Sequence, residues 1–292
     1  MKDSVDKIIK EAYAKINLGL DVLRRREDGY HEVKMIMQTV DIHDTLTFVK
    51  REEPGIVLAV DDQELSTDSD NLIYKAAKLL LEKAGVTQGV EISLQKRIPI
   101  AAGMAGGSSD AAATLSGLNE LFSLGYSLEE LQALGVTLGA DIPYCLMGGT
   151  ALSEGIGEIL TRLPSPPQCS LVVAKPDINV STKFVYENLH VDTLTYHPDV
   201  DGMVQAINAG DLKGITDRLG NVLETVTIRE YPIIDNIKDV MKKAGAENTL
   251  MSGSGPTVFG IFTKEDRAKE AARQIREQGL AEQIFVTGFV SP

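Results

Sequence analysis

Hydrophobic and polar residues alternate in the first fifty residues of the chain, which is the pattern of half-buried β-strands. The alternation covers residues 14–23 and returns over residues 33–40, and a further strand is expected over residues 45–49. Asp28 and Gly29 lie between the first two segments, and this dipeptide favours a tight hairpin turn. The chain is therefore expected to begin with paired strands.

The middle of the chain shows instead the three-to-four-residue spacing of amphipathic helices. Apolar residues at this spacing follow Ser69-Asp70-Asn71 and end before Gly85, which predicts a helix with a capping residue in front and a glycine at its end. Ser127 and Glu130 form a capping box for a later helix that extends to about residue 138. Between these two helices, the pattern predicts a strand over residues 90–94 and a helix over about residues 108–122.

Short helices and strands follow one another irregularly in the second half. The pattern predicts strands over residues 171–174, 257–262 and 284–290, several helices between about residues 182 and 244, and a charged helix over residues 263–279. The proline-rich residues 164–167 are the most linker-like stretch, so a boundary is expected between domains 1–163 and 164–292. The irregular alternation favours an α+β fold.

Composition and charge exclude several classes of function. The chain has 292 residues with 42 acidic and 29 basic side chains, a net charge of −13, which argues against a nucleic-acid partner. The basic residues 24–26 are followed at once by Glu27 and Asp28 and are expected to form a solvated turn. No apolar run is long enough for a membrane span, and the N-terminus does not resemble a signal peptide, so a cytoplasmic location is expected. Two cysteines and four scattered histidines argue against disulfides and zinc.

A glycine-rich loop over residues 99–107 separates an expected strand from an expected helix. Glycines let the backbone approach a ligand closely, and the helix N-terminus adds a partial positive charge, so neutral groups could bind a phosphate here. The loop is neither a Walker A loop nor a Rossmann fingerprint. The alternative is a loop that only caps a tightly packed helix. Ser108 and Ser109 would be helix caps or hydroxyl ligands of a phosphate group or of Mg²⁺.

Three segments carry a family resemblance: residues 99–112, residues 14–18 and residues 252–257. Together they resemble the motifs of the GHMP superfamily of small-molecule kinases. Residues 26–31, 70–73, 138–143 and 154–158 resemble the members that phosphorylate a cytidine-diphosphate-linked methylerythritol. The resemblance implies a two-domain α+β GHMP kinase fold with the active site in the interdomain cleft. It also implies transfer of the ATP γ-phosphate to the 2-hydroxyl of that substrate, with Mg²⁺.

Two departures from the family pattern are visible. Met104 and Ala105 stand where the loop usually has Leu-Gly, and Asp110 stands where Asn is common. Neither departure removes a backbone N–H group, so phosphate binding is expected to survive. Asp110 is expected to add a negative charge at the helix start, which is slightly unfavourable for a nearby phosphate.

The resemblance assigns catalysis to Lys15 and Asp141. Asp141 would orient the substrate hydroxyl and accept its proton, and Lys15 would keep that carboxylate ionised and neutralise charge on the transferring phosphoryl group. From the residues alone, Asp141 could be a helix N-cap and Lys15 a lysine on the solvent face of a strand. The resemblance assigns no protein ligand to a metal.

The resemblance also assigns binding residues. The ATP-binding residues would be Asn71, Lys96, Pro99, Ile100, Ala101, Ala102, Gly103, Met104, Ala105, Gly106, Gly107, Ser108 and Ser109. The substrate-binding residues would be Asn17 and Thr182 at the methylerythritol diphosphate end, and Tyr30, His31 and Tyr186 around the cytidine. Taken alone, Lys96 could be a solvated charge at a strand end, and Tyr30 with His31 could be surface packing. Residues 252–257 could be a tight helix-to-strand connection.

Other functions remain in competition at this point. Another member of the superfamily, such as a homoserine, mevalonate or galactose kinase, would have no cytosine for Tyr30 and His31 to hold. A nucleotide-binding regulator on the same fold would need neither Lys15 nor Asp141. A structural protein would leave three glycine-rich turns unexplained. The partners expected are a small-molecule substrate and no nucleic acid or membrane, for a monomer or homodimer.

Overall fold

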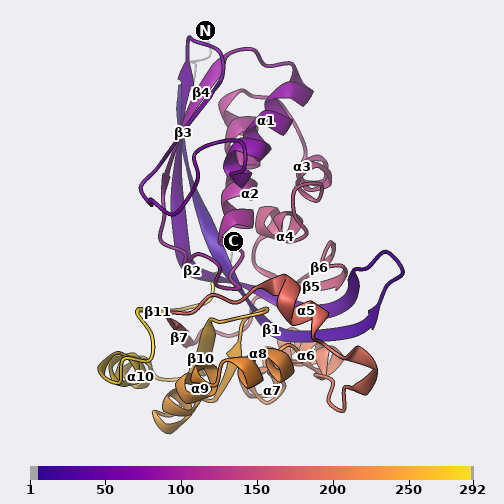
Figure 1. Ribbon diagram of the computed structural model, residues 1–292, viewed down its shortest axis with the longest axis vertical. Coiled ribbons are helices and arrows are strands. Elements are labelled where there is room, and N and C mark those ends of the chain that lie inside the picture. Colours follow the sequence, from indigo (N-terminus) through magenta and orange to yellow (C-terminus); the bar gives the residue numbers. More distant parts are fainter. Residues whose placement is uncertain (1–5, 291–292) are drawn as a thin grey trace. The chain divides into compact units, whose positions relative to one another are not determined.

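Strands β1 (Lys7–Arg25) and β2 (His31–Arg51) are the longest elements of the protein, and each contributes to both of the units into which the chain folds (Figure 1). The computed structural model describes residues 6–290. The first unit contains the described residues up to Ala14, Ile42–Ile100 and Ala105–Met147. The second unit contains Lys15–Asp41, Ala101–Met104 and the described residues from Gly148 onwards.

The predicted N-terminal hairpin is confirmed, with Gly29 in its turn at a φ of +88°. The strands expected over residues 33–40 and 45–49 are wrong as two elements, because β2 runs through both without a break. Each half of β2 has its own partner: residues 33–38 pair with β5 (Thr150–Gly155), and residues 45–51 pair with β4 (Gly89–Gln95). The polar residues between the halves obscured this continuity in the sequence pattern.

The first unit is a sheet covered on one face by helices (Figure 1). Strand β4 pairs antiparallel with β2 and parallel with β3 (Ile56–Val60), a strand that the sequence pattern did not reveal. The helices are α1 (Leu72–Ala84), α2 (Gly106–Leu121), α3 (Leu128–Gly135) and α4 (Ile142–Met147). The predicted caps are confirmed: Asn71 and Gly85 bound α1, and the Ser127–Glu130 capping box begins α3.

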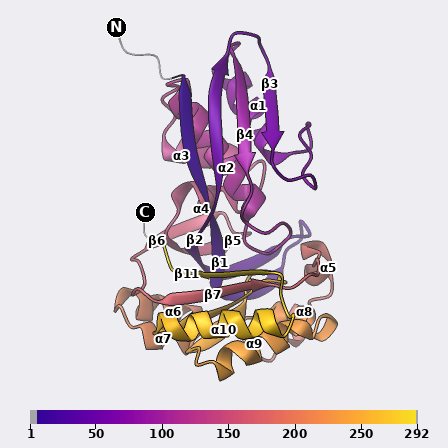
Figure 2. The same cartoon turned by 90° about the vertical axis from the view of Figure 1, so that its left-hand side faces the viewer.

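The second unit contains a four-stranded antiparallel sheet of order β11-β7-β10-β9, with α9 and α10 lying along it (Figure 2). These strands are β7 (Ser170–Lys175), β9 (Asn248–Met251), β10 (Val258–Phe262) and β11 (Gln283–Thr287). The predicted strands at 171–174, 257–262 and 284–290 are thus confirmed, within one to three residues at their ends. The helices are α5 (Thr182–Glu187), α6 (Val200–Asn208), α7 (Leu212–Thr216), α8 (Glu224–Glu230), α9 (Ile233–Lys243) and α10 (Glu265–Glu277), with a 3₁₀ turn at Val191–Thr193.

Two further pairings complete the second unit. Strands β5 and β6 (Ile159–Leu163) form a hairpin, and β8 (Gly220–Asn221) pairs parallel with β1. Because β5 pairs with β2, residues 148–163 group with the second unit rather than with the residues that precede them. The boundary between folding domains at residue 163 stays a prediction. None of the helices within residues 6–290 combines the length and the apolar character that crossing a membrane requires.

One glycine of α2 tests how tightly the first unit is packed. A Cβ at Gly117 would lie 2.6 Å from Cε2 of Phe48, whose ring is fully buried in the core. Because that ring cannot move without opening a void, Gly117→Ala is expected to lower the free energy of unfolding by about 1–3 kcal/mol. Urea denaturation measures the change.

Gly107→Ala, in the same helix, is the matched control. Its Cβ would meet only Cδ1 of Leu72 at 3.5 Å, an ordinary contact. This variant is expected to keep or slightly raise stability, since alanine favours the helix. Equal losses in the two variants would show that Phe48 is not the cause.

Candidate active site

The glycine-rich loop enters α2 through an unusual backbone. Ala101, Gly103 and Ala105 all have positive φ, at 51°, 69° and 57°, and they alternate with residues of negative φ. Such alternation turns successive N–H groups towards one side, which is an arrangement that binds anions. Ala105 caps α2 in the left-handed conformation, so the departure from glycine at this position leaves the backbone geometry intact.

The loop is held by the turn over residues 252–255. Ser252 Oγ donates to the carbonyl oxygen of Gly103 at 3.1 Å, and a Cβ on Gly103 would lie 2.4 Å from the Ser252 carbonyl oxygen. A Cβ on Gly253 would lie 3.2 Å from the same Gly103 oxygen. The turn connects β9 to β10, so the expected helix-to-strand connection is wrong: it joins two strands. Its role in supporting the loop is visible in these contacts.

Lys15 meets the loop at the same carbonyl. Its side chain is 6% exposed, and Nζ donates to the Gly103 oxygen at 3.3 Å and to Asn17 Oδ1 at 2.8 Å. The Lys15 backbone N–H also donates to the Met104 oxygen at 3.1 Å. The alternative of a solvent-facing lysine is therefore wrong. The Lys15 ammonium, fixed by these two oxygens, lies where it can attract an anion bound at the loop.

Asn17, which accepts the hydrogen bond from Lys15, is fully buried. Its N–H donates to Ser252 Oγ at 3.4 Å, and its Nδ2 donates to the sulfur of Met35 at 3.2 Å. Asn17 therefore orients Lys15 and links β1 to the 252–255 turn. Its expected contact with substrate stays a prediction.

The start of α2 lies in the first unit, close to the turn that carries Asp141. A Cβ on Gly139 would lie 3.8 Å from Ser108 Oγ, which places the loop's first serine beside that turn. Asp141 immediately precedes α4, and its carbonyl oxygen accepts from the Cys145 N–H at 3.0 Å. It thus stands where a helix cap would stand, as the residues alone suggested. Its predicted partner Lys15 belongs to the second unit, so their pairing stays a prediction.

Two residues expected to contact ATP have local partners. Ser109 Oγ donates to the Tyr13 carbonyl oxygen at 2.5 Å and fastens α2 to β1, and its contact with ATP stays a prediction. Asn71 Oδ1 accepts from the Ile73 N–H at 2.8 Å, and its Nδ2 donates to the Ser66 oxygen at 2.7 Å. Asn71 is thus the cap of α1, and its contact with adenine stays a prediction.

Lys96 lies in a buried cluster with two carboxylates. Its Nζ is 2.5 Å from Asp44 Oδ2 and 2.9 Å from Asp110 Oδ2, so the alternative of a solvated strand-end charge is wrong. Burial lowers the pKa of Lys96, but the Asp110 and Asp44 carboxylates outweigh it and raise that pKa above its ordinary value. The sequence analysis missed Asp44, because it lies between the two expected strands 33–40 and 45–49 and its burial follows only from the continuity of β2.

Asp110 does not behave as the sequence suggested. Burial raises the pKa of its carboxyl group to about 8; nearby Lys96 opposes this rise and Asp44 adds to it. Burial and Asp44 thus favour the protonated form of Asp110, which would lessen the negative charge expected at the start of α2.

The residues expected around the cytidine lie in the second unit. The rings of His31 and Tyr186 are 5.1 Å apart between centroids, with their planes at 40°. Burial, followed by the charge of Arg25, lowers the pKa of His31 below its ordinary value, so the imidazole is neutral at pH 7. Tyr30 is 60% exposed on the hairpin. Thr182 Oγ1 lies 2.8 Å from Ser254 Oγ, which ties α5 to the 252–255 turn.

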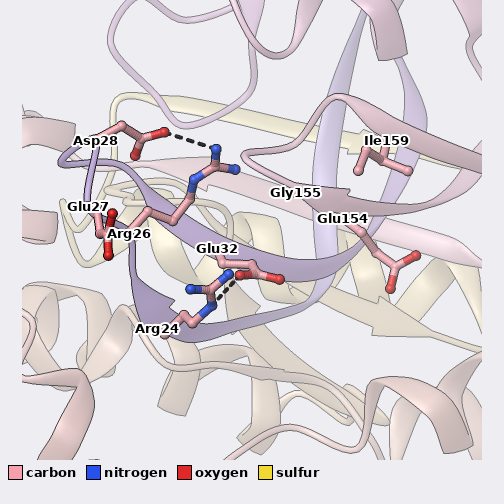
Figure 3. A pocket seen from close by; sticks show the side chains of 8 residues that line it. All are labelled: Arg24, Arg26, Glu27, Asp28, Glu32, Glu154, Gly155 and Ile159. Carbon is pink, nitrogen blue, oxygen red and sulfur yellow. Dashed lines mark ion pairs between the residues drawn. The ribbon is translucent and has the colours of Figure 1, made fainter.

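Two arginines of the hairpin, Arg24 and Arg26, are paired with acidic side chains (Figure 3). Arg24 lies 2.5 Å from Glu32, and Arg26 lies 2.9 Å from Asp28. These pairs line an open pocket together with Glu27, Glu154, Gly155 and Ile159. The pocket has more acidic than basic side chains, which agrees with a solvated turn.

Comparison with known proteins defines the class. The model of the GHMP kinases N-terminal domain matches residues 71–149, and that of the GHMP kinases C-terminal domain matches residues 203–281. A solved homoserine kinase from Cytophaga hutchinsonii shares the fold, with a TM-score of 0.79 at 22% identity over 98% of this chain and 96% of that one. The fold and the glycine-rich loop are thus those of a GHMP kinase.

More similar relatives narrow the class to one family. A protein of Lachnoclostridium phytofermentans named 4-diphosphocytidyl-2-C-methyl-D-erythritol kinase is 52% identical over 98% of both chains. One of the same name from Lachnospira eligens is 50% identical, over 99% of this chain and 100% of the relative. A crystal structure of 4-(cytidine 5'-diphospho)-2C-methyl-D-erythritol kinase matches with a TM-score of 0.82 at 35% identity, over 98% of this chain and 100% of that one. The chain belongs to the 4-diphosphocytidyl-2-C-methyl-D-erythritol kinase family of GHMP kinases.

The contact between the loop and the 252–255 turn gives a testable prediction. Gly103→Ala adds a Cβ that would overlap the Ser252 carbonyl, so the loop or the 252–255 turn must shift. A misplaced phosphate site typically costs about a hundredfold in rate. The expected result is a loss of this size in kcat/KM, measured as ADP release.

Gly85→Ala is the matched control, because Gly85 has nearly the same φ, at +66°, and nothing within 4 Å of an added Cβ. It is expected to lose about 1 kcal/mol of stability through backbone strain alone and to keep its kcat/KM. If both variants lost activity equally, strain rather than the Ser252 contact would be the cause.

Proposed function

We propose that the chain transfers the γ-phosphate of ATP to the 2-hydroxyl of 4-diphosphocytidyl-2-C-methyl-D-erythritol, in the biosynthesis of isoprenoid precursors. The observation that carries the proposal is the hydrogen bond from the buried Lys15 ammonium to the Gly103 carbonyl oxygen of the glycine-rich loop. That contact joins a cation to a backbone anion site, which a phosphoryl-transfer enzyme requires. Full-length similarity to relatives of this name supports the choice of substrate.

Nucleotide binding would use backbone groups more than charge. The N–H groups of the loop and the start of α2 would hold the phosphates of ATP, with Ser108 next to the Asp141 turn. Ser109 and Lys96 would act indirectly, since their polar atoms already bind the protein. The residues of the loop would thus bind ATP through their backbone N–H groups rather than through their side chains.

The transfer itself would be divided between Asp141 and Lys15. Asp141 would accept the proton of the 2-hydroxyl while the hydroxyl oxygen forms a bond to the γ-phosphorus and the bond to the β-phosphate oxygen breaks, releasing ADP. Lys15 would neutralise charge on the moving phosphoryl group. Because the acceptor is a hindered tertiary alcohol, positioning would supply much of the rate enhancement.

The second unit offers groups that suit the cytidine end of the substrate. A neutral His31 can both donate and accept hydrogen bonds, and the Tyr186 ring beside it offers a stacking surface. Tyr30 is exposed enough to reach a ligand. Asn17 and Thr182 would contact the methylerythritol diphosphate end, next to the 252–255 turn.

Mg²⁺ is proposed to accompany ATP. Within residues 6–290, no three His, Cys, Asp or Glu side chains lie close enough to hold a metal ion. Asp44 and Asp110 near the loop are already bound to Lys96. The nucleotide phosphates would hold the ion. A cytoplasmic location and a monomeric or homodimeric state complete the proposal.

Asp141→Asn tests the catalytic assignment. Asparagine caps helices as well as aspartate does, so the fold is expected to be retained while the proton acceptor is lost. Removal of a general base typically costs about 10²–10⁴ in kcat. The expected result is a loss in this range in a steady-state ADP-release assay.

Asp199→Asn is the control, because Asp199 is the side-chain cap of α6 and accepts from the Gly202 N–H at 2.9 Å. It is expected to leave kcat unchanged. If Asp141→Asn behaved like Asp199→Asn, then Asp141 would be only a cap and the assignment would fail.

The substrate is tested by offering ATP and Mg²⁺ with the cytidine-linked methylerythritol, mevalonate, homoserine or galactose in separate assays. Only the cytidine compound is expected to stimulate ADP release. Stimulation by another acceptor would reassign the substrate within the GHMP kinases, and stimulation by none would favour a nucleotide-binding regulator.

A further inference from the structure

The cluster of Lys96, Asp44 and Asp110 contains one cation and two carboxyl groups in a buried place. The side chains of all three are 6% exposed or less. If every group were ionised, the cluster would hold one uncompensated negative charge away from water, which is costly. A single proton on one of the two carboxyl groups removes that charge.

The hydrogen bonds show which carboxyl group holds the proton. Asp44 has three donors: the Lys96 ammonium on Oδ2, and the N–H groups of Arg97 and Ile98 on Oδ1 at 2.5 and 2.8 Å. Asp110 accepts from Lys96 on Oδ2, but its Oδ1 is buried without a hydrogen-bond partner in the part of the chain that the structure describes. A carboxylate with three donors favours the ionised form, so Asp110 is the group that takes the proton.

The cluster closes the base of the glycine-rich loop. Lys96 precedes the loop and Asp110 lies one turn into α2 behind it, so the ion pair fastens one end of the loop to the other. A Cβ on Gly106 would lie 3.0 Å from Lys96 Nζ, which places the ammonium directly beside the first residue of α2. Any change in the charge of this cluster is therefore felt where the phosphates of a nucleotide would bind.

We propose that Asp110 is a positioning residue that works in its protonated form: it holds Lys96 beside the start of α2 without adding negative charge, and its ionisation weakens nucleotide binding. This inference rests on the proposed binding of ATP at the loop.

The direction of the pH dependence follows from the groups that face Asp110. These are Lys96, from the segment after β4, and Asp44, from β2; burial and Asp44 together raise the pKa of Asp110 to about 8 against the opposing effect of Lys96. Below that pH the cluster is neutral and ATP binds most tightly. Above it, the cluster carries a negative charge that repels the phosphates. At an effective dielectric constant of about 20, a unit charge about 10 Å away changes affinity roughly tenfold.

The test is the Kd for ATP, measured by calorimetry from pH 6.5 to 9.5 without an acceptor substrate. For the unaltered protein, Kd is expected to rise about tenfold through pH 8. In Asp110→Asn the rise is expected to disappear, because the side chain no longer ionises. Ionisation of ATP itself is the same in both proteins. Parallel curves for the two proteins would overturn the proposal.

Asp61→Asn is the matched control. Asp61 accepts from the Lys96 backbone N–H at 2.7 Å but lies outside the buried cluster, on the exposed side of the same residue. It is expected to keep the rise in Kd. If Asp61→Asn also removed the rise, the effect would come from loss of any nearby acid, and the assignment to Asp110 would be wrong.

The pH dependence of unfolding provides a measurement that needs no nucleotide. Because the folded-state pKa of Asp110 is raised, the folded protein holds a proton that the unfolded chain releases between about pH 4 and 8. The contribution of Asp110 to stability is therefore expected to be lost across this range, so that stability falls more, or rises less, with pH in the unaltered protein than in Asp110→Asn. An equal change in both would show that Asp110 holds no such proton. Absence of ATP binding at every pH would instead reject the proposed function.

Discussion

The Gly103 carbonyl is the point on which the site depends. Lys15 and Ser252, from opposite ends of the sequence, both donate to this oxygen, and the Asn17 N–H donates in turn to Ser252 Oγ. A buried ammonium needs oxygens around it, and a glycine-rich loop needs something to fix its course. One carbonyl meets both needs. The loop geometry and the position of the lysine are consequently a single property of the fold.

This arrangement explains how a chain with a net charge of −13 can hold polyanions. The acidity belongs largely to exposed side chains, whereas the loop offers oriented N–H groups and the start of α2. Of the two buried lysines near the loop, Lys96 is already balanced by carboxyl groups, and Lys15 is held by neutral oxygens. Lys15 is therefore the lysine whose charge is proposed to meet the transferring phosphoryl group.

Local signals predicted much of the fold, and contacts between distant residues account for what they missed. Asn71, Gly85 and the Ser127 capping box bound their helices as expected because a cap depends on neighbours within a few residues. The continuity of β2 was hidden, because its two halves pair with different strands far along the chain. The Asp44–Lys96 pair was hidden for the same reason. Its members are 52 residues apart, and the spacing of apolar residues carries no information about such a contact.

The loop also separates two reasons for which a motif contains glycine. Ala101 and Ala105 occupy left-handed conformations with their Cβ atoms present, at a strain of about 1–2 kcal/mol each. Gly103 has a similar φ, but its Cβ would lie 2.4 Å from the Ser252 oxygen. Backbone strain can be offset elsewhere in the fold, whereas overlap with a carbonyl moves the loop itself. Gly103 is therefore the glycine that the site cannot lose, because it contacts a distant segment of the chain. At position 105 the motif requires only a left-handed backbone, which Ala105 also adopts.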